Sequence, residues 1–141
     1  MPRELHIKNF SIIDDVTVEF GEGFNVLTGE TGAGKSIIID ALSLALGERA
    51  GSEFIRSGEK EALVEAFFEI SPESLSPASL EFLNDSGIDL DDGIILKRII
   101  SAQGKNRAYI NGSMVNVQTL SDISKNIVDV HGQYEHQSLL T

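Results

Sequence analysis

The sequence predicts an α/β fold, because it places a glycine-rich loop between a short strand and a buried helix. Residues 24–28 are a short stretch bounded by glycines that predicts a strand, and residues 29–36 are rich in glycine. Residues 37–46 are apolar on nearly all sides, which is typical of a helix that is buried against a sheet. Alternating apolar and polar residues elsewhere in the chain predict further strands of that sheet.

The composition is typical of one compact globular domain. The chain has 141 residues, 41% of them hydrophobic, with a mean hydropathy close to zero. It contains no cysteine, so neither disulfides nor thiolate metal sites can contribute. The N-terminus leads into alternating polar and apolar residues, and no apolar run is long enough to cross a bilayer. We therefore expect a cytoplasmic location and no membrane partner.

The formal net charge of −11 argues against strong DNA binding by this chain alone, because affinity for phosphate backbones comes largely from lysine and arginine. One local exception could form a small basic patch on a hairpin. No aromatic residues are interleaved as a stacking platform, so a solvated hairpin surface is the favoured interpretation. The four basic residues are Lys97, Arg98, Lys105 and Arg107.

The N-terminal third predicts a hairpin followed by the strand, loop and helix described above. Residues 5–10 and 16–20 alternate as two strands, and Asp14-Asp15 marks the turn between them. Gly47 is a natural stop for the helix over residues 37–46.

The middle of the chain predicts a surface loop, a strand and a short helix. Residues 51–60 are polar and contain glycine, and residues 62–70 alternate as a strand. Ser76 is a suitable N-cap and Pro77 a suitable first residue for a helix over residues 77–83.

The last third predicts a second hairpin, a helix and a buried strand. The Asn111-Gly112 pair is a strong signal for a tight hairpin turn. The predicted strands are 94–100, 107–110 and 127–130, and the predicted helix covers residues 116–123.

Residues 29–36 match the pattern G-x-x-x-x-G-K-[ST], the Walker A phosphate loop. The glycines allow backbone angles that point successive N–H groups inward as an anion nest. Lys35 reaches the β- and γ-phosphates, Ser36 offers its hydroxyl to Mg²⁺, and the following helix directs its positive end at the same phosphates. The pattern predicts a P-loop NTPase that binds ATP with Mg²⁺. The loop consists of Gly29, Glu30, Thr31, Gly32, Ala33, Gly34, Lys35 and Ser36.

Hydrolysis also needs a carboxylate that helps to hold Mg²⁺ at the end of a second apolar strand. Asp129 is a weak candidate, because its apolar lead-in is two residues long and Val130 rather than an acid follows it. The polar cluster at residues 131–137 follows the same strand and could reach bound nucleotide. Its two histidines and glutamate match no common zinc spacing. No Asn-Lys-x-Asp sequence supports a preference for guanine.

Several stretches, one of which contains the phosphate loop, carry a family resemblance. They lie at residues 5–10, 25–36, 47–50, 107–112 and 129–137. Together they resemble the ABC-type ATPases related to structural maintenance of chromosomes (SMC) proteins, in the branch that acts in bacterial DNA repair. The resemblance covers essentially the whole chain. It implies the N-terminal lobe of an ATPase head, with a mixed central sheet around the phosphate-loop helix and a flanking antiparallel β subdomain.

The resemblance also assigns roles to individual residues. It implies that Lys35 and Ser36 contact phosphate and Mg²⁺, and that Thr28 belongs to the nucleotide-binding set. Gln133 matches the Q-loop glutamine, which contacts Mg²⁺ and the attacking water, so Lys35 and Gln133 are the implied catalytic residues. Arg49 is placed like an arginine that approaches nucleotide in related heads, with a helix-end cation as the equal alternative.

The resemblance further implies that residues 1–141 are one lobe of a longer protein, which continues from about Leu140 into a coiled coil. The signature motif, the Walker B acids and the switch histidine are absent from the sequence. Hydrolysis would therefore need the C-terminal lobe of the same head and a second head in an ATP-sandwiched dimer. The full-length protein would engage DNA at the bacterial nucleoid, in double-strand break repair and recombination.

Two other functional interpretations remain open. One is a nucleotide-independent module that docks DNA or a protein partner. The other is a small-molecule kinase, for which Arg49 and Arg56 alone make no arginine-bearing lid.

Overall fold

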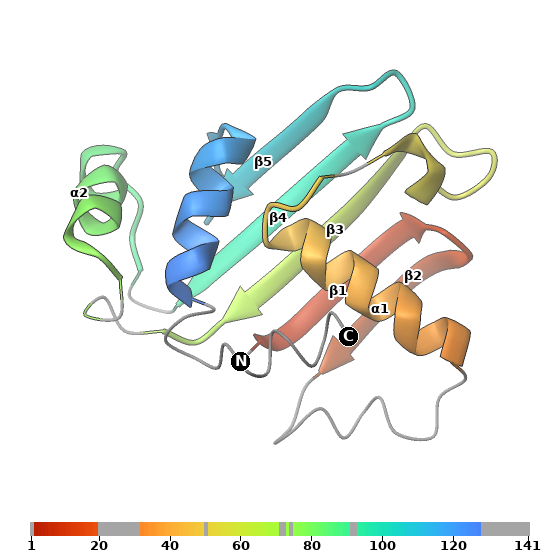
Figure 1. The fold of residues 1–141 in the computed structure, drawn as a ribbon, viewed down its shortest axis with the longest axis horizontal. Coiled ribbons are helices and arrows are strands. Elements are labelled where there is room, and N and C mark those ends of the chain that lie inside the picture. Colours follow the sequence, from red (N-terminus) through yellow and green to blue (C-terminus); the bar gives the residue numbers. More distant parts are fainter. Residues whose placement is uncertain are drawn as a thin grey trace.

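The helices of the chain gather on one face of an antiparallel sheet (Figure 1). The computed structural model describes residues 2–19, 32–49, 51–70, 73, 75–90 and 93–127. Within this part, helix α1 (Gly32–Ala45) and the helix over residues 117–127 cover the sheet, and α2 (Pro77–Asp85) lies beyond the latter. None of these described helices is long and apolar enough to cross a membrane.

The described part of the sheet has six strands in the order β2-β1-β3-β4-β5-β6, and all neighbours are antiparallel. The strands are β1 (Pro2–Phe10), β2 (Ile13–Glu19), β3 (Glu61–Phe68), β4 (Ile94–Ser101), β5 (Asn106–Ile110) and β6 (Ser113–Val115). The predicted α/β fold class is confirmed. The strand predicted at residues 24–28 lies outside the described residues.

The N-terminal hairpin of β1 and β2 is confirmed, but its predicted turn is wrong. Phe10 pairs with Ile13, so the turn lies at residues 11–12 and not at Asp14-Asp15. Both aspartates belong to β2, which is mostly exposed and forms one edge of the described sheet. Charged side chains on an edge strand stay in water and oppose pairing with another chain, which explains why two acids fit within this strand.

The centre of the core lies between β1, β3 and α1. Leu5 and Ile7 of β1 are fully buried and pair with Ala66 and Val64 of β3. Because successive side chains of a strand point to opposite faces, this register directs all four toward the helices. The buried residues of α1 on this side are Ala41, Leu42, Leu44 and Ala45.

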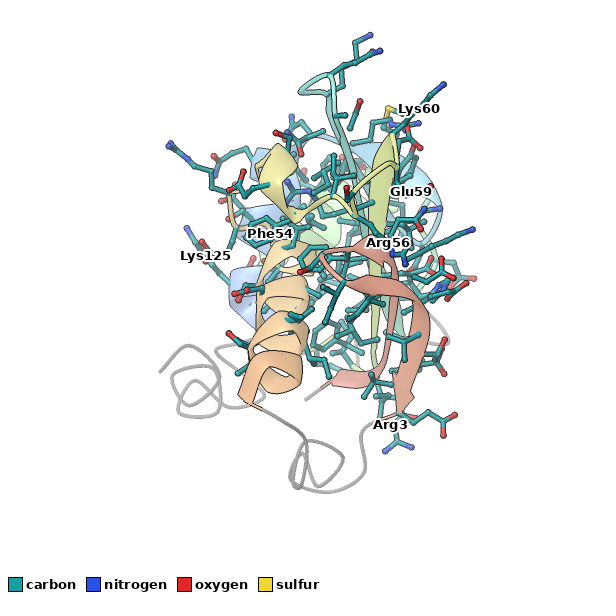
Figure 2. All side chains as sticks on the ribbon, turned by 90° about the vertical axis from the view of Figure 1, so that its right-hand side faces the viewer. Arg3, Phe54, Arg56, Glu59, Lys60 and Lys125 are labelled. Carbon is teal, nitrogen blue, oxygen red and sulfur yellow. The ribbon has the colours of Figure 1, made fainter. Side chains whose placement is uncertain are left out.

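The predicted surface loop at residues 51–60 is partly packed onto the core. It contains a 3₁₀ turn, η2 (Ser52–Phe54), whose Phe54 is labelled in Figure 2. The ring of Phe54 stacks on that of Phe10 with centroids 5.2 Å apart. Ile55 also forms an isolated bridge to Phe10. The loop therefore covers the end of β1, which its polar composition did not indicate.

The cap predicted for α2 is confirmed. Ser76 has extended backbone angles, and its hydroxyl accepts a hydrogen bond from the backbone N–H of Ser79 at 3.2 Å. Pro77 takes the first helical position. The backbone N–H of Ser76 donates to the side-chain oxygen of Asn126 at 2.6 Å, which ties the start of α2 to the 117–127 helix.

We expect Ser76→Ala to lower the free energy of unfolding by about 1 kcal/mol, because one N–H of the first turn of α2 loses its acceptor. Urea denaturation measures this loss. Ser86→Ala, at the exposed C-terminal end of the same helix, is the control and should change stability by less than about 0.5 kcal/mol. Equal effects of the two substitutions would contradict the capping role.

The hairpin of β5 and β6 turns at Asn111-Gly112, as predicted. Both residues have positive φ, 48° and 85°, as a two-residue type I′ turn requires. The side chain of Asn111 also accepts from the backbone N–H of Ile95 at 2.7 Å and donates to the carbonyl oxygens of Asp89 and Gly93. The turn thereby holds the segment that leads into β4.

The helix predicted at residues 116–123 is confirmed but is longer. Asn116 caps it by accepting from the backbone N–H of Thr119 at 2.7 Å, and the helix includes Ile127. The prediction of a strand that starts at Ile127 is therefore wrong at that residue. Ile123 and Ile127 are four residues apart and both buried, which is the spacing of one helical face. Residues 128–130 lie outside the described residues.

Candidate functional site

The second half of the predicted phosphate loop forms the start of α1. The helix begins at Gly32 and not at Ile37, so the glycine-lysine-serine end of the pattern lies in its first turns. The first N–H groups of a helix have no partner within it, so they continue the row of free amides expected from the loop. The described start of α1 comprises Gly32, Ala33, Gly34, Lys35 and Ser36.

The electrostatics of this helix end suit an anion. The partial positive charge of a helix dipole lies at its N-terminus, and the first turn of α1 contains no acidic residue that would compete for it. The side chain of Ser36 is exposed, which leaves its hydroxyl accessible. Hydroxyl oxygen is a hard ligand of the kind that Mg²⁺ prefers, so this residue fits the predicted metal role.

Several predicted site residues fall on parts of the chain that the structure leaves undescribed. Gln133, Asp129 and the polar cluster at residues 131–137 lie outside the described residues. So does the side chain of Lys35. The same holds for the first half of the loop, which comprises Thr28, Gly29, Glu30 and Thr31.

Arg49 is exposed and lies just past the C-terminal end of α1. With a rise of about 1.5 Å per residue, the helix separates Ser36 from Ala45 by about 14 Å. The structure therefore does not bring Arg49 together with Ser36. The helix-end cation interpretation stays a prediction, because the last turn of α1 contains no basic residue and Arg49 lies four residues past Ala45.

The C-terminal end of α1 closes with the predicted glycine stop at Gly47. This residue has a φ of 98°, its N–H donates to the carbonyl of Leu44, and the N–H of Glu48 donates to that of Ser43, each at 3.1 Å. These two bonds form a Schellman motif, which satisfies carbonyl groups that the helix leaves free. A β-carbon on Gly47 would lie 2.7 Å from the Cα atom of Ser121, so the 117–127 helix passes directly over this turn.

Arg98 of β4 reaches the same turn from the sheet. It is only 2% exposed, and its Nη1 donates to the carbonyl oxygens of Leu44 at 3.0 Å and of Glu48 at 3.1 Å. Its Nη2 makes a long contact of 3.5 Å with the side chain of Asn106. Burial lowers the pKa of the Arg98 guanidinium, because desolvation disfavours the charged form.

The basic hairpin considered from the sequence does not form one patch. Arg98 points into the core, so both earlier interpretations are wrong for this residue. Arg107 pairs with Glu61, and the ammonium of Lys97 lies 5.2 Å from the centre of the Tyr109 ring. Adjacent residues of a strand point to opposite faces, which is why neighbours in sequence diverge here.

Ser124 is a second side chain that binds the C-terminal end of α1. Its hydroxyl is buried and donates to the carbonyl oxygen of Leu46. Sequence reasoning missed both Arg98 and Ser124. For Arg98, the alternation of β4 could have indicated burial. Position 98 falls on the same face of the strand as Ile94, Leu96 and Ile100, which are all buried.

Comparison with known proteins gives a family and close relatives for this chain. The family described as AAA domain matches residues 4–139. The DNA repair protein RecN of Halalkalibacterium halodurans is 51% identical over 138 residues, which cover 97% of this chain and 24% of the relative. RecN of Bacillus subtilis is 48% identical over 141 residues, covering 99% of this chain and 24% of the relative. The chain thus spans about a quarter of the length of these curated relatives and matches their N-terminal part.

Comparison of folds points the same way. A chain solved in work on ATP-driven dimerization and DNA stimulated activation of SMC ATPases superposes with a TM-score of 0.71 at 23% identity. The match covers 93% of this chain and 83% of that one. At this identity the likeness establishes the fold, which is that of the N-terminal lobe of a P-loop ATPase head.

Proposed function

The chain belongs to the family of AAA domains, and from this premise we propose that it is the ATP-binding N-terminal lobe of an SMC-like ATPase that acts in DNA repair. Its identity of 51% and 48% with two RecN proteins over nearly the whole chain supports DNA repair as the process, and double-strand break repair and recombination are the finer part of the proposal. The proposed ATPase activity is that of the full-length protein, which we take to resemble these relatives in length.

One observation carries the proposal. The Walker A pattern ends within the first turns of α1, at a helix end that has no acidic residue and whose helix is packed onto the sheet. In this proposal, free amides, the helix dipole and the lysine would converge on one anion, as triphosphate binding requires. A glycine-rich surface turn without a ligand would have no need of a buried helix behind it.

The roles follow from the chemistry of each residue. In this proposal the backbone of residues 28–36 cradles the phosphates, Lys35 contacts the β- and γ-phosphates, and Ser36 holds Mg²⁺. Bound Mg²⁺ would neutralise negative charge on the phosphate oxygens. Gln133 would orient the attacking water, while Arg49 would contact nucleotide only if another part of the assembly brings it there.

Titration of the full-length protein with ATP and Mg²⁺ by calorimetry tests the proposal. We expect saturable heat with one ATP per head. No detectable binding would contradict the proposal. The isolated lobe should bind weakly and turn over slowly or not at all, because the C-terminal lobe and a second head would supply the rest of the site.

We expect Gln133→Ala in the full-length protein to lower kcat by about tenfold to a hundredfold, with a much smaller change in the affinity for ATP. A water-orienting group acts mainly in the transition state, so its loss affects turnover more than ground-state binding. Steady-state hydrolysis and calorimetry on the same preparation separate the two. Gln118→Ala, which removes an exposed amide on the 117–127 helix, is the control. A loss of affinity without loss of turnover would contradict the role.

The structure weakens one argument for the alternative, a nucleotide-independent docking module. Its basic hairpin was the feature that favoured DNA, and Arg98 of that hairpin is buried while Arg107 is paired with Glu61.

A further inference from the structure

Two side chains from different elements hold the C-terminal end of α1. Arg98 of β4 donates to the carbonyl oxygens of Leu44 and Glu48, and Ser124 of the 117–127 helix donates to that of Leu46. Three carbonyls of one turn are thereby bound by the sheet behind the helix and by the helix beside it. Figure 1 shows β4 behind the end of α1 and the 117–127 helix beside it.

The chemistry of Arg98 is unusual for a residue whose role is only to fill the core. No carboxylate lies within ion-pair distance of it among the described residues, and its buried Nε has no hydrogen-bond partner within that part of the chain. Its charge is instead compensated by carbonyl dipoles at the negative end of the α1 macrodipole. A buried charge without a counter-ion is costly, whereas an apolar side chain of similar length would fill the same space.

We infer that Arg98 is a positioning residue for the phosphate loop, an inference that rests on the proposed ATP-binding function. Apolar packing fixes which face of α1 meets the sheet but resists sliding along the helix axis only weakly, because it is not directional. The two directional bonds from Arg98 fix the axial position of the helix. Because α1 is one continuous rod, a shift at Leu44 is transmitted to the free amides at Gly32.

The consequence concerns binding geometry and not only stability. A displacement of about 1 Å at a site can cost about a hundredfold in function, because hydrogen bonds to a rigid ligand are short and directional. Arg98 therefore influences ATP affinity from the end of α1 that lies away from the nucleotide.

The experiment compares Arg98→Met, Arg98→Lys and Arg107→Met in the full-length protein. Methionine keeps an unbranched apolar stem and removes the donors, whereas lysine keeps a cation that can reach one carbonyl. Arg107 belongs to the neighbouring strand and is partly exposed, so Arg107→Met is a control for loss of one positive charge. ATP affinity is measured by calorimetry at a temperature where circular dichroism shows each variant to be folded.

We expect Arg98→Met to weaken ATP binding by about tenfold to a hundredfold, Arg98→Lys to recover part of the loss, and Arg107→Met to bind like wild type. A purely structural role would lower the melting temperature and leave the affinity of the folded protein unchanged, and that result would overturn the inference. If Arg98→Met does not fold, wild-type affinity in Arg98→Lys overturns it equally. Lys35→Ala, run in parallel, separates the two hypotheses: loss of binding there, with normal binding in the Arg98 variants, leaves the proposed function intact and rejects the positioning role.

Discussion

Lys35→Ala is expected to weaken the binding of ATP with Mg²⁺ by at least about a hundredfold in the full-length protein. The ammonium contributes charge-assisted hydrogen bonds to two phosphates, and the loss of such bonds costs about 3 kcal/mol, which corresponds to about a hundredfold in affinity. The backbone amides and the helix dipole remain, so weak binding of phosphate should persist at high concentration. Calorimetric titration measures the difference directly.

The matched control is Lys125→Ala. Lys125 is exposed on the 117–127 helix (Figure 2), so its replacement changes the net charge equally without touching the start of α1. The long-range effect of one exposed charge is largely screened at physiological ionic strength. If both variants bind ATP like wild type, the Walker A interpretation is wrong for this chain. If both lose affinity equally, the effect is one of net charge and not of the loop.

The sequence predicted correctly those features that depend only on residues close together in the chain. Ser76-Pro77 marks the start of α2 because the cap and the first turn involve neighbouring residues only. Asn111-Gly112 marks the hairpin turn because both positions need positive φ. The Walker A pattern likewise predicted a helix after the glycine-rich loop, but the predicted start at Ile37 is wrong because α1 begins at Gly32, inside the pattern.

The wrong predictions concern residues whose structure depends on contacts with other parts of the chain. Asp14 and Asp15 have high turn propensity, yet the pairing of Phe10 with Ile13 overrides it because both are drawn to the core face. Ile127 begins a short apolar run that fits a strand or a helix equally well until its packing partners are known. Arg98 was assigned to the surface from its charge, because its carbonyl partners are about fifty residues away in sequence.

The sequence therefore predicted the phosphate loop of the candidate site. It did not predict the side chains that bind the C-terminal end of α1. The G-x-x-x-x-G-K-[ST] pattern is contiguous, so the sequence carries it directly. The bonds from Arg98 and Ser124 to the end of α1 depend on tertiary contact between three elements, and no spacing rule indicates them. These contacts meet at Gly47, which makes this glycine a sensitive probe of the packing behind the loop.

Gly47→Ala is expected to lower the free energy of unfolding by about 3 kcal/mol. An L-residue at its φ of 98° is strained, and the new β-carbon would lie 2.7 Å from the Cα of Ser121, so backbone must move. The displaced element is the 117–127 helix, which carries the Ser124 hydroxyl bound to Leu46. Urea denaturation of the chain measures the loss, and amide hydrogen exchange shows whether protection falls at the end of α1.

Gly87→Ala separates conformational strain from steric contact. Gly87 ends α2 in the same way, with a φ of 72°, and Ile88 donates to the carbonyl of Leu83 as Glu48 does to that of Ser43. Among the described residues, no atom apart from those of Gly87 and its chain neighbours lies within 4 Å of a β-carbon built on Gly87, so its substitution should cost only the strain, about 1 kcal/mol. The excess cost at Gly47 is then the free energy of close approach between α1 and the 117–127 helix. Equal costs at the two glycines would mean that these helices can separate freely, and the end of α1 could not then be a fixed anchor for the phosphate loop.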